Sequence, residues 1–379
     1  HMHILVLNWG SSSVKCSLFA FLGPQDNPIK PLYQDKIEWK NHSQENASSL
    51  YAQLKDKQVD CIGHRIVHGG TKFKESVYID AEVKKELKKL EDLAPLHQKA
   101  SLNGIKAMES LFPNTPQIAV FDTAFHSTLP PHAYTYPIPH EWSEMGIRRY
   151  GFHGISYQYC SKRAAQLLKE MPDKMVICHL GAGASLCALK KGTSIDTTMG
   201  FTPLEGLMMD TRSGSIDPGI LLYLLNKHQI TPETLSKRLY EESGLLGVSG
   251  FSSDMRDVLQ EAMKGNARAE LAIDTYMHRL SAEITSMIAS LGGIDTLVFT
   301  AGIGENAAIV RERACKQLEF LGIELQDKEG EEEDRIISSA NSKVKVLVIH
   351  TKEAFEIACE CWKKNRIGRH THQANSCSP

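Results

Sequence analysis

Apolar and polar residues follow two patterns along the chain. The first pattern predicts a strand, a turn rich in small residues and a second strand. Residues 4–19 show it as a short apolar run, a Gly/Ser turn and an apolar–polar alternation, as expected for a half-buried strand. The same order returns over residues 175–189. An overlay of the two segments pairs Gly10 with Gly181 and Cys16 with Cys187. The sequence therefore predicts a duplicated α/β unit with a cleft between the two copies.

The second pattern places apolar residues three and four positions apart, which is typical of helices with one buried face. Residues 81–93 and 100–111 follow it, and two prolines end it before a predicted strand at residues 117–121. In the second half we predict helices at residues 156–169, 218–227, 268–291 and 306–321, and strands at residues 295–300 and 344–349.

The length of 379 residues is sufficient for two domains. Four prolines between residues 130 and 139 indicate irregular chain near a domain boundary. We expect an N-terminal domain over residues 1–150, completed by a C-terminal helix over residues 354–368, and a second domain over residues 151–353. Residues 369–379 are polar and are expected to form a disordered tail.

Composition narrows the class of protein. Hydrophobic residues make up 42% of the chain and charged residues 23%, so two cores can form without disulfides or structural metal. The formal net charge of −2 provides no field that would attract nucleic acid or an anionic membrane, and neither is expected as a partner. The nine cysteines contain no CxxC pair, which fits a reducing compartment. Residues 3–7 are too short an apolar stretch for a signal peptide, so we expect a cytoplasmic protein.

Three glycine-containing turns follow apolar strands, at residues 10–13, 181–183 and 301–306. Glycine lets a phosphate approach the backbone N–H groups of such a junction closely. A simple tight turn is an equally good explanation for any one of them. Three in one α/β chain favour a nucleotide-binding cleft.

Two arginines lie in short segments bounded by glycine. Arg65 lies within residues 63–70 and Arg212 within residues 209–214, where few other charges occur. A lone arginine in a loop is usually a surface charge, but two in such surroundings favour an anionic ligand. A planar guanidinium can bind phosphate or carboxylate through two hydrogen bonds.

An aspartate and a histidine have comparable positions. Asp122 directly follows the predicted strand at residues 117–121, and a buried carboxylate requires a metal or a base nearby. Binding Mg²⁺ or orienting a nucleophile explains it, and capping a turn is the alternative. His153 lies between two glycines, and a structural role is its alternative.

These segments together resemble the acetate kinase family. The matching motifs, in family order, are residues 7–15 (LNWGSSSVK), 63–70 (GHRIVHGG), 93–97 (LAPLH), 121–126 (FDTAFH), 151–154 (GFHG), 200–219 (GFTPLEGLMMDTRSGSIDPG), 252–256 (SSDMR) and 302–306 (GIGEN). The resemblance extends from residue 4 to about residue 360.

The resemblance implies a fold like that of the sugar kinase, Hsp70 and actin superfamily, with two duplicated ribonuclease-H-like domains and an interdomain nucleotide cleft. It implies reversible transfer of a phosphoryl group from ATP to acetate, giving acetyl phosphate and ADP by direct in-line transfer. Mg²⁺, or Mn²⁺ in its place, would be required. The family is generally dimeric, so the resemblance also implies a homodimer.

The resemblance also assigns roles to residues of this sequence. The catalytic residues would be Arg65, Asp122, His153 and Arg212, of which His153 and Arg212 would stabilise the transition state. Acetate would be bound by Arg65 and an apolar pocket of Val67, Leu96, Phe152 and Pro203. The metal would be held by Asn8 and, through water, by Glu353. The nucleotide would be bound mainly by the second domain, with one residue, Lys15, from the first. The residues of the second domain assigned to it are His179, Gly181, Gly183, Asp254, Met255, Arg256, Gly302, Ile303, Gly304, Glu305 and Asn306.

The sequence departs from the family pattern at several positions. Ala182 replaces an asparagine, Asp210 a glycine and Tyr157 a histidine, while Gln98 and Lys99 replace Asn-Pro. Each change can be neutral. Ala182 and Asp210 together are alternatively expected to slow turnover or to change the phosphoryl donor.

Two other functions compete with this interpretation. A propionate or butyrate kinase of the same superfamily differs by one or two methylenes in the acceptor, each worth only about 1–3 kcal/mol in an apolar pocket. A nucleotide-dependent switch protein would need the phosphate-binding turns but not the two arginines. The family motifs favour acetate over butyrate, and the arginines favour the enzyme.

Overall fold

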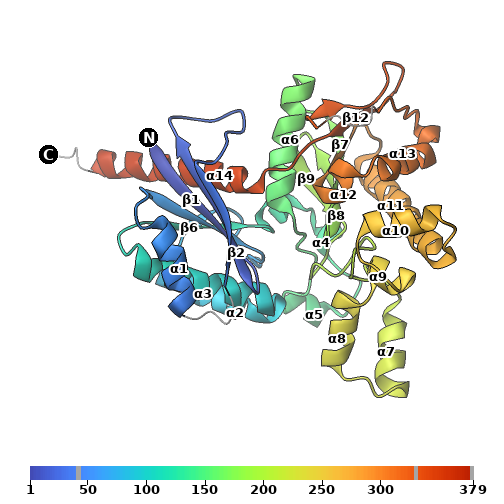
Figure 1. The fold of residues 1–379 in the computed structure, drawn as a ribbon, viewed down its shortest axis with the longest axis horizontal. Helices are drawn as coiled ribbons and strands as arrows, with labels where there is room; N and C mark the ends of the chain where they lie inside the picture. The colour runs from blue at the N-terminus through green and yellow to red at the C-terminus, as the bar shows by residue number, and fades with distance from the viewer. Residues whose placement is uncertain (40–43, 328–331, 376–379) are drawn as a thin grey trace. The chain divides into compact units, whose positions relative to one another are not determined.

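The structure is a computed structural model and describes residues 1–39, 44–327 and 332–375. The chain divides into two compact units (Figure 1). The first contains residues 1–127, 154–159 and the chain from Lys352, and the second contains residues 128–153 and 160–351. Residues 128–153 thus group with the second unit, whereas the proline-rich composition led us to expect a boundary near residue 150.

The first unit is built on a six-stranded sheet with the order β3-β2-β1-β4-β6-β5. Its strands are β1 (Met2–Trp9), β2 (Ser13–Phe21), β3 (Tyr33–Glu38), β4 (Cys61–Ile66), β5 (Val77–Tyr78) and β6 (Gln117–Phe121). The central strands β1, β4 and β6 are parallel, while β2, β3 and β5 pair antiparallel with their neighbours. The predicted strand at residues 117–121 is confirmed.

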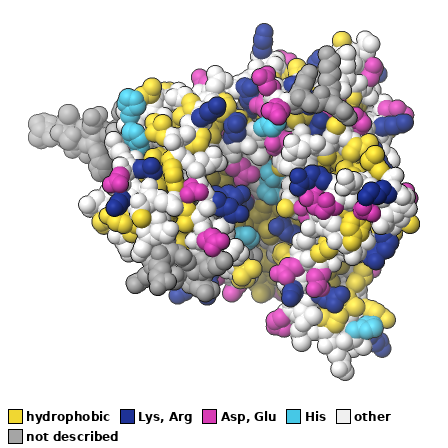
Figure 2. All heavy atoms as spheres, viewed as in Figure 1, with side chains coloured by type: hydrophobic (Ala, Val, Ile, Leu, Met, Phe, Trp, Pro, Cys, Tyr) yellow, Lys and Arg dark blue, Asp and Glu magenta, His cyan; other side chains and the backbone are white. Residues whose placement is uncertain are grey.

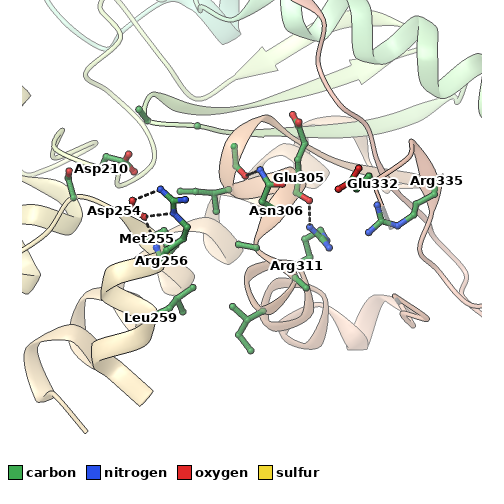
Figure 3. A pocket seen from close by; sticks show the side chains of 18 residues that line it. Asp210, Asp254, Met255, Arg256, Leu259, Glu305, Asn306, Arg311, Glu332 and Arg335 are labelled. Atoms are coloured by element: carbon green, nitrogen blue, oxygen red, sulfur yellow. Dashed lines mark hydrogen bonds and ion pairs between the residues drawn. The ribbon is translucent and has the colours of Figure 1, made fainter. Parts of the chain in front are cut away.

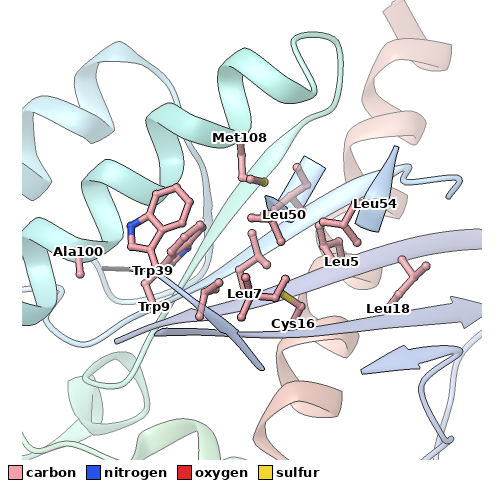
Figure 4. Close-up of a cluster of buried hydrophobic side chains, with 13 residues drawn as sticks. Leu5, Leu7, Trp9, Cys16, Leu18, Trp39, Leu50, Leu54, Ala100 and Met108 are labelled. Carbon is pink, nitrogen blue, oxygen red and sulfur yellow. The ribbon is translucent and has the colours of Figure 1, made fainter. Parts of the chain in front are cut away.

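Helices pack on both faces of this sheet. They are α1 (Gln44–Leu54), α2 (Ala81–Lys89), α3 (Pro95–Leu111) and α14 (Glu353–Asn375), with short 3₁₀ helices at Glu91–Leu93 and Ala124–Thr128. On one face, alternate residues of β1 (Leu5, Leu7 and Trp9) pack with Leu50 of α1 and Met108 of α3 (Figure 4). The opposite face contacts α14.

Two glycines allow the helices to approach the sheet this closely. A Cβ atom at Gly104 of α3 would lie 2.1 Å from the Trp9 ring. A Cβ atom at Gly63 of β4 would lie 2.6 Å from the Cys361 Sγ atom of α14. Any larger residue would force these elements apart, so both glycines fix the helices on the strands that carry the site.

The second unit has its own six-stranded sheet, with the order β11-β12-β10-β7-β8-β9. Its strands are β7 (Lys174–Leu180), β8 (Ala184–Lys190), β9 (Thr193–Thr197), β10 (Thr296–Thr300), β11 (Arg335–Ile336) and β12 (Lys345–Val348). Here β7, β10 and β12 are parallel, and β8, β9 and β11 pair antiparallel. The predicted strands near residues 175, 295 and 344 are confirmed.

The helices predicted for the second half of the chain are present, and the structure adds several shorter ones. They are α4 (Pro131–Tyr134), α5 (His140–Glu144), α7 (Pro218–Lys227), α8 (Pro232–Glu241), α9 (Gly244–Ser249), α10 (Met255–Met263), α11 (Ala267–Leu291), α12 (Ala301–Asn306) and α13 (Ala308–Gln317), with a 3₁₀ helix at Glu319–Leu321. Helix α6 (Gly154–Leu168) has its first residues in the first unit and the rest in the second. The long helix α11 packs on β7, β8 and β9.

The two sheets have the same topology, which confirms the predicted duplication. In each, three strands form an antiparallel meander. The first strand of the meander is parallel to the next two strands of the sheet, and a short antiparallel strand lies at the edge beyond them. The predicted overlay is wrong by one residue in the second strand, because Trp9 pairs with Val14 whereas Leu180 pairs with Ala184. The turn between β7 and β8 is therefore one residue shorter. Cys16 corresponds in position to Leu186 rather than to Cys187.

Two other expectations are corrected. Residues 301–306 form the short helix α12 rather than a turn before a helix, since their backbone is already helical from Ala301. The tail expected to be disordered from residue 369 is helical to Asn375, where α14 ends. Residues 376–379 lie outside the described residues.

The surface and the cysteines agree with the composition. On the face drawn in Figure 2, basic and acidic side chains are interspersed. The cysteines of the described ranges are all unpaired and buried. Among the helices that the structure describes, none is both long and apolar enough to cross a membrane.

Candidate active site

The first unit gathers four of the predicted site residues, Asn8, Arg65, Asp122 and Glu353, which we call the Arg65 set. Asn8 lies near the end of β1, Arg65 near the end of β4, and Asp122 directly after β6. Because these three strands are parallel and adjacent, their carboxyl ends share one edge of the sheet, where ligands of α/β proteins usually bind. Glu353 begins α14.

Arg65 is the centre of this set. Its Nε and Nη2 atoms donate to the two carboxylate oxygens of Asp122 at 3.0 and 2.6 Å, and its Nη1 atom donates to Asn8 Oδ1 at 3.3 Å. The Asp122 side chain is 1% exposed and that of Arg65 19%. Among the described residues, three of the five guanidinium N–H donors are used in this way. Two remain on the partly exposed edge for a ligand.

The charges around Arg65 keep it ionised. Burial alone would lower the pKa of Arg65, but the negative charges of Asp122 and Glu353 outweigh burial and raise this pKa above its usual range. The guanidinium is therefore a fixed positive charge. Its charge is partly neutralised by the ion pair with Asp122.

His64, the neighbour of Arg65 in β4, has a structural role. It is fully buried, its Nδ1 atom accepts from Trp9 Nε1 at 2.9 Å, and its Nε2 atom contacts Gln117 Oε1. Burial lowers the pKa of His64 to about 4, so the ring is neutral at physiological pH and donates from Nε2 to Gln117. This buried chain of side chains ties β1, β4 and β6 together beneath the edge that carries the Arg65 set.

Hydrogen bonds also fix the backbone at Asp122, directly after β6. Asp122 N–H donates to Ile66 O at 2.9 Å, and Gly154 N–H donates to Asp122 O at 2.9 Å. A Cβ atom at Gly154 would lie 2.4 Å from Asp122 O, which explains the glycine at this position. Tyr157, which replaces a family histidine, is buried and packs edge-on against the ring of His126.

Three further predicted residues lie in the first unit. Lys15 is exposed and is the cross-strand partner of Asn8, so both side chains lie on the same face of the sheet. Val67 is buried just after β4, whereas Leu96, at the start of α3, is 71% exposed. Val67 and Leu96 were predicted to share an apolar pocket, and this remains a prediction.

In the second unit, His153, His179, Gly183 and Arg212 converge, and we call them the Arg212 set. The rings of His153 and His179 are stacked with centroids 4.0 Å apart. A Cβ atom at Gly183 would lie 3.2 Å from Arg212 Nη1 and 3.5 Å from His153 Nε2. The turn between β7 and β8 thus lies directly against a guanidinium and an imidazole, and its glycine leaves room for a ligand between them.

The backbone and Ser185 position the two histidine rings and Arg212. His153 has φ of 58°, a left-handed conformation uncommon for a residue other than glycine, and its Nδ1 atom lies 2.9 Å from Ser185 Oγ of β8. Arg212 Nη1 donates to the Pro203 carbonyl at 3.2 Å. Of the predicted pocket residues in this unit, Phe152 is fully buried and Pro203 contributes this carbonyl.

A cavity of about 990 Å³ lies in the second unit beside the same turn (Figure 3). We call it the α10–α12 cavity. It is lined by Gly181, Ala182, Asp210, Ser253, Asp254, Met255, Arg256, Leu259, Gly302, Ile303, Glu305, Asn306, Ala307, Ala308, Ile309, Arg311, Glu332 and Arg335. Most of the residues predicted to bind the nucleotide are therefore brought together here. Gly304 is buried behind the lining, and Lys15 belongs to the first unit.

The α10 side of the cavity is defined by an exposed ion pair. Asp254 caps α10 by accepting from Arg256 N–H at 2.8 Å, and the Arg256 guanidinium binds the same carboxylate through Nε and Nη2. These hydrogen bonds lower the pKa of Asp254. The motif at residues 252–256 therefore builds a helix N-terminus with its own counter-charge.

On the other side, a buried arginine that the sequence did not single out anchors α12. Arg311 of α13 is 3% exposed and donates from Nη1 to the carbonyls of Gly304 and Glu305 at 2.9 and 3.0 Å. Its Nε and Nη2 atoms bind Asp327 Oδ2, while Arg335 binds Asp327 Oδ1. No local signal distinguishes Arg311 from the other arginines of a charged helix.

The two sets are suited to anions of different kinds. The Arg65 set offers two N–H donors beside oxygen ligands, which suits a small carboxylate. The Arg212 set offers a guanidinium and two imidazoles beside a glycine turn, which suits phosphate. No group of three acids, histidines or cysteines able to enclose a metal is found among the described residues.

Comparison with known proteins finds acetate kinases and a propionate kinase that resemble this chain over almost its whole length. The acetokinase family model matches residues 34–359. An acetate kinase of Microcystis aeruginosa is 49% identical over 95% of this chain and 99% of its own length. A crystal structure of Porphyromonas gingivalis acetate kinase superposes with a TM-score of 0.88 at 37% identity, covering 96% of this chain and 99% of that one. A propionate kinase from Francisella tularensis superposes with a TM-score of 0.87 at 38% identity, covering 96% of this chain and 100% of that one.

The buried position of Arg311 predicts a large effect of its removal. Arg311→Met leaves the carbonyls of Gly304 and Glu305 without this donor and Asp327 with Arg335 alone, so we expect a loss of roughly 3 kcal/mol in unfolding free energy. Amide exchange over residues 301–307 should accelerate as well. Urea denaturation and hydrogen exchange measure the two effects.

The matched control is Arg313→Met in the same helix. Arg313 forms an exposed pair with Asp274, so its loss should change the unfolding free energy by less than about 0.5 kcal/mol. Equal effects of the two substitutions would contradict the anchoring role of Arg311.

Proposed function

The chain belongs to the acetokinase family, and on that premise we propose that it catalyses reversible phosphoryl transfer from ATP to acetate, giving acetyl phosphate and ADP. The observation that carries the proposal is the convergence of His153, His179 and Arg212 on the Gly183 turn, beside the α10–α12 cavity. Such a group can hold and polarise a phosphoryl group.

In this proposal ATP occupies the α10–α12 cavity. Its adenosine lies near Asp254, Met255 and Arg256, and its phosphates follow residues 302–306 toward the turn at residues 181–183. Support comes from the dimensions of the cavity, about 990 Å³, which can accommodate a nucleotide. The Cβ position of Gly302 has no atom within 4 Å, so a phosphate can approach the backbone there.

Acetate is proposed to bind at Arg65. The two remaining N–H donors of its guanidinium suit the two carboxylate oxygens. Val67, two residues after Arg65 in the sequence, is buried, and the family resemblance assigns it to the apolar surface for the methyl group together with Leu96, Phe152 and Pro203. The pairing with Asp122 sets the orientation of the guanidinium.

The reaction is also proposed to require Mg²⁺, or Mn²⁺ in its place. Asn8 and Glu353, with Asp122 nearby, offer hard oxygen ligands, and Mg²⁺ is commonly held by one or two carboxylates, water and substrate phosphates rather than by a complete protein cage. The residues present fit that pattern. A bound Mg²⁺ would neutralise charge on the phosphates.

The chain's own residues supply the rest of the chemistry. An acetate oxygen attacks the γ-phosphorus directly, the bond from phosphorus to the bridging oxygen breaks, and the electron pair stays on ADP. A carboxylate is already nucleophilic and carries no proton, so no general base is required. The difficulty is the approach of two anions, which Arg65 reduces at acetate, and Arg212 and His153 at the phosphoryl oxygens.

A propionate kinase is the second candidate. A solved propionate kinase has nearly the same similarity to this chain as a solved acetate kinase. One added methylene changes the transition-state energy by only about 1–3 kcal/mol in an apolar pocket. Acceptor length is therefore a necessary variable in the assay.

We also propose that the protein is a homodimer and that α7 contributes to the interface. The first eight residues of α7, residues 218–225, carry no charge, and α7 has no buried residue. Ile220, Leu222 and Tyr223 are exposed. A twofold interface places the same patch on both subunits, so an uncharged apolar helix suits pairing with a second copy.

The activity is tested by incubating the protein with ATP, Mg²⁺ and acetate and trapping acetyl phosphate as its hydroxamate. Arg212→Ala should lower kcat/KM by roughly 10²–10³-fold, as for other transition-state donors. Arg238→Ala, which removes an exposed arginine of α8, is the matched control and should change little. Product from propionate but not acetate would select the second candidate, and equal activity of Arg212→Ala and Arg238→Ala would contradict the role of Arg212.

The dimer is tested by light scattering coupled to size-exclusion chromatography. Leu222→Lys places a charge in the apolar face of α7 and should convert the dimer to a monomer at micromolar concentration. Lys237→Glu on the neighbouring α8 changes an exposed charge and should leave the mass unchanged. An unaltered dimer mass for Leu222→Lys would show that α7 lies outside the interface.

A further inference from the structure

Asp210 is an acid in an unexpected position. It lines the α10–α12 cavity next to the turn between β7 and β8 (Figure 3), where its backbone N–H lies 3.4 Å from Ala182 O. Its Oδ1 atom is buried and has no hydrogen-bond partner within the described part of the chain. A buried carboxylate oxygen without a donor is costly when ionised. The fold therefore gains little from this carboxylate in its ionised form.

The three arginines that line the cavity are already paired with carboxylates. Arg256 binds Asp254, and both Arg311 and Arg335 bind Asp327. The lining contains four acids (Asp210, Asp254, Glu305 and Glu332) against these three arginines. An anionic ligand that enters the cavity therefore meets little uncompensated positive charge on this side. An additional ionised carboxylate would oppose its binding.

The groups that face Asp210 favour its neutral form. Burial and the negative charge of Asp254 on α10 raise the pKa of Asp210 to about 7, against the opposing effect of Arg212 in the same loop. On α11, Tyr276 is buried, and burial together with the charge of Asp210 raises the pKa of its hydroxyl further. Tyr276 is thus uncharged near pH 7, and Asp254 stays ionised because Arg256 lowers its pKa.

We propose that Asp210 controls nucleotide affinity in the α10–α12 cavity, with tight binding when its carboxyl group is protonated and weak binding when it is ionised. The inference rests on the proposed nucleotide site. Its sign follows from charge, because a phosphate chain is repelled by the carboxylate but accepts a hydrogen bond from the carboxylic acid. Affinity for the nucleotide should therefore fall as pH rises through the range in which Asp210 ionises.

The proposal is tested by calorimetric titration of the full-length protein with Mg·ADP at pH 6 and pH 8. Asp210→Asn keeps the shape of the side chain and removes its charge. It should bind Mg·ADP roughly tenfold more tightly than the unaltered protein at pH 8, the factor that corresponds to a shift of one pKa unit. At pH 6 the two proteins should bind alike. Asp210→Gly, which removes the group entirely, should also tighten binding at pH 8.

Glu233→Gln is the matched control, since it removes a charge from an exposed residue of α8 that does not line the cavity and should have little effect at either pH. Weaker or unchanged binding by both Asp210 variants at pH 8 would overturn the proposal. Absence of Mg·ADP binding by the unaltered protein at both pH values would instead contradict the proposed nucleotide site. The two failures are therefore distinguishable.

Discussion

Parallel pairing of the central strands is the constraint on which the candidate site depends. In the first unit it aligns β1, β4 and β6, so that Asn8, Arg65 and Asp122 meet although each interaction with Arg65 joins residues 57 positions apart. In the second unit the pairing of β7 with β10 brings the Gly181 turn against Ala301, with 3.6 Å from a Cβ at Gly181 to the Cβ of Ala301. A slip of one residue would turn these side chains to the opposite face of the sheet.

A second constraint is the control of charge. The two arginines of the candidate site are not simply surplus positive charges, because Arg65 is bound by Asp122 and Arg212 is held by the Pro203 carbonyl. The cavity beside the Arg212 set contains both signs of charge, mostly in pairs. Asp210 extends the same balance, since its protonation would alter it by one charge.

The sequence predicted the parts of the fold that local pattern determines. The strands and long helices came from apolar periodicity, and the site residues came from motifs that resemble a known family. Contacts between distant segments could not be obtained in this way. Ser185 contacts His153, and Arg311 and Asp327 anchor α12, but nothing in the neighbouring sequence of these residues signals the partner. The one-residue difference between the two hairpins depends on turn geometry, which apolar periodicity does not report.

The burial of individual residues could not be predicted from the sequence either. Leu96 was expected in an apolar pocket and is largely exposed, because it lies in the first turn of α3, whose buried face is formed by later residues. Conversely, the sequence marked Asp210 only as a departure from the family pattern, and the structure shows that one buried oxygen of its carboxylate lacks a partner among the described residues. Charge and exposure arise from packing, and packing is the property that a linear pattern describes least well.

The central claim is that the phosphoryl group passes directly from ATP to acetate. The most direct measurement uses ATP made chiral at its γ-phosphorus with sulfur and oxygen isotopes, followed by analysis of the configuration of the thiophosphoryl product. Direct in-line attack by the acetate oxygen predicts inversion of configuration. Retention would require an even number of displacements, and therefore a phosphorylated enzyme residue, and would contradict the account.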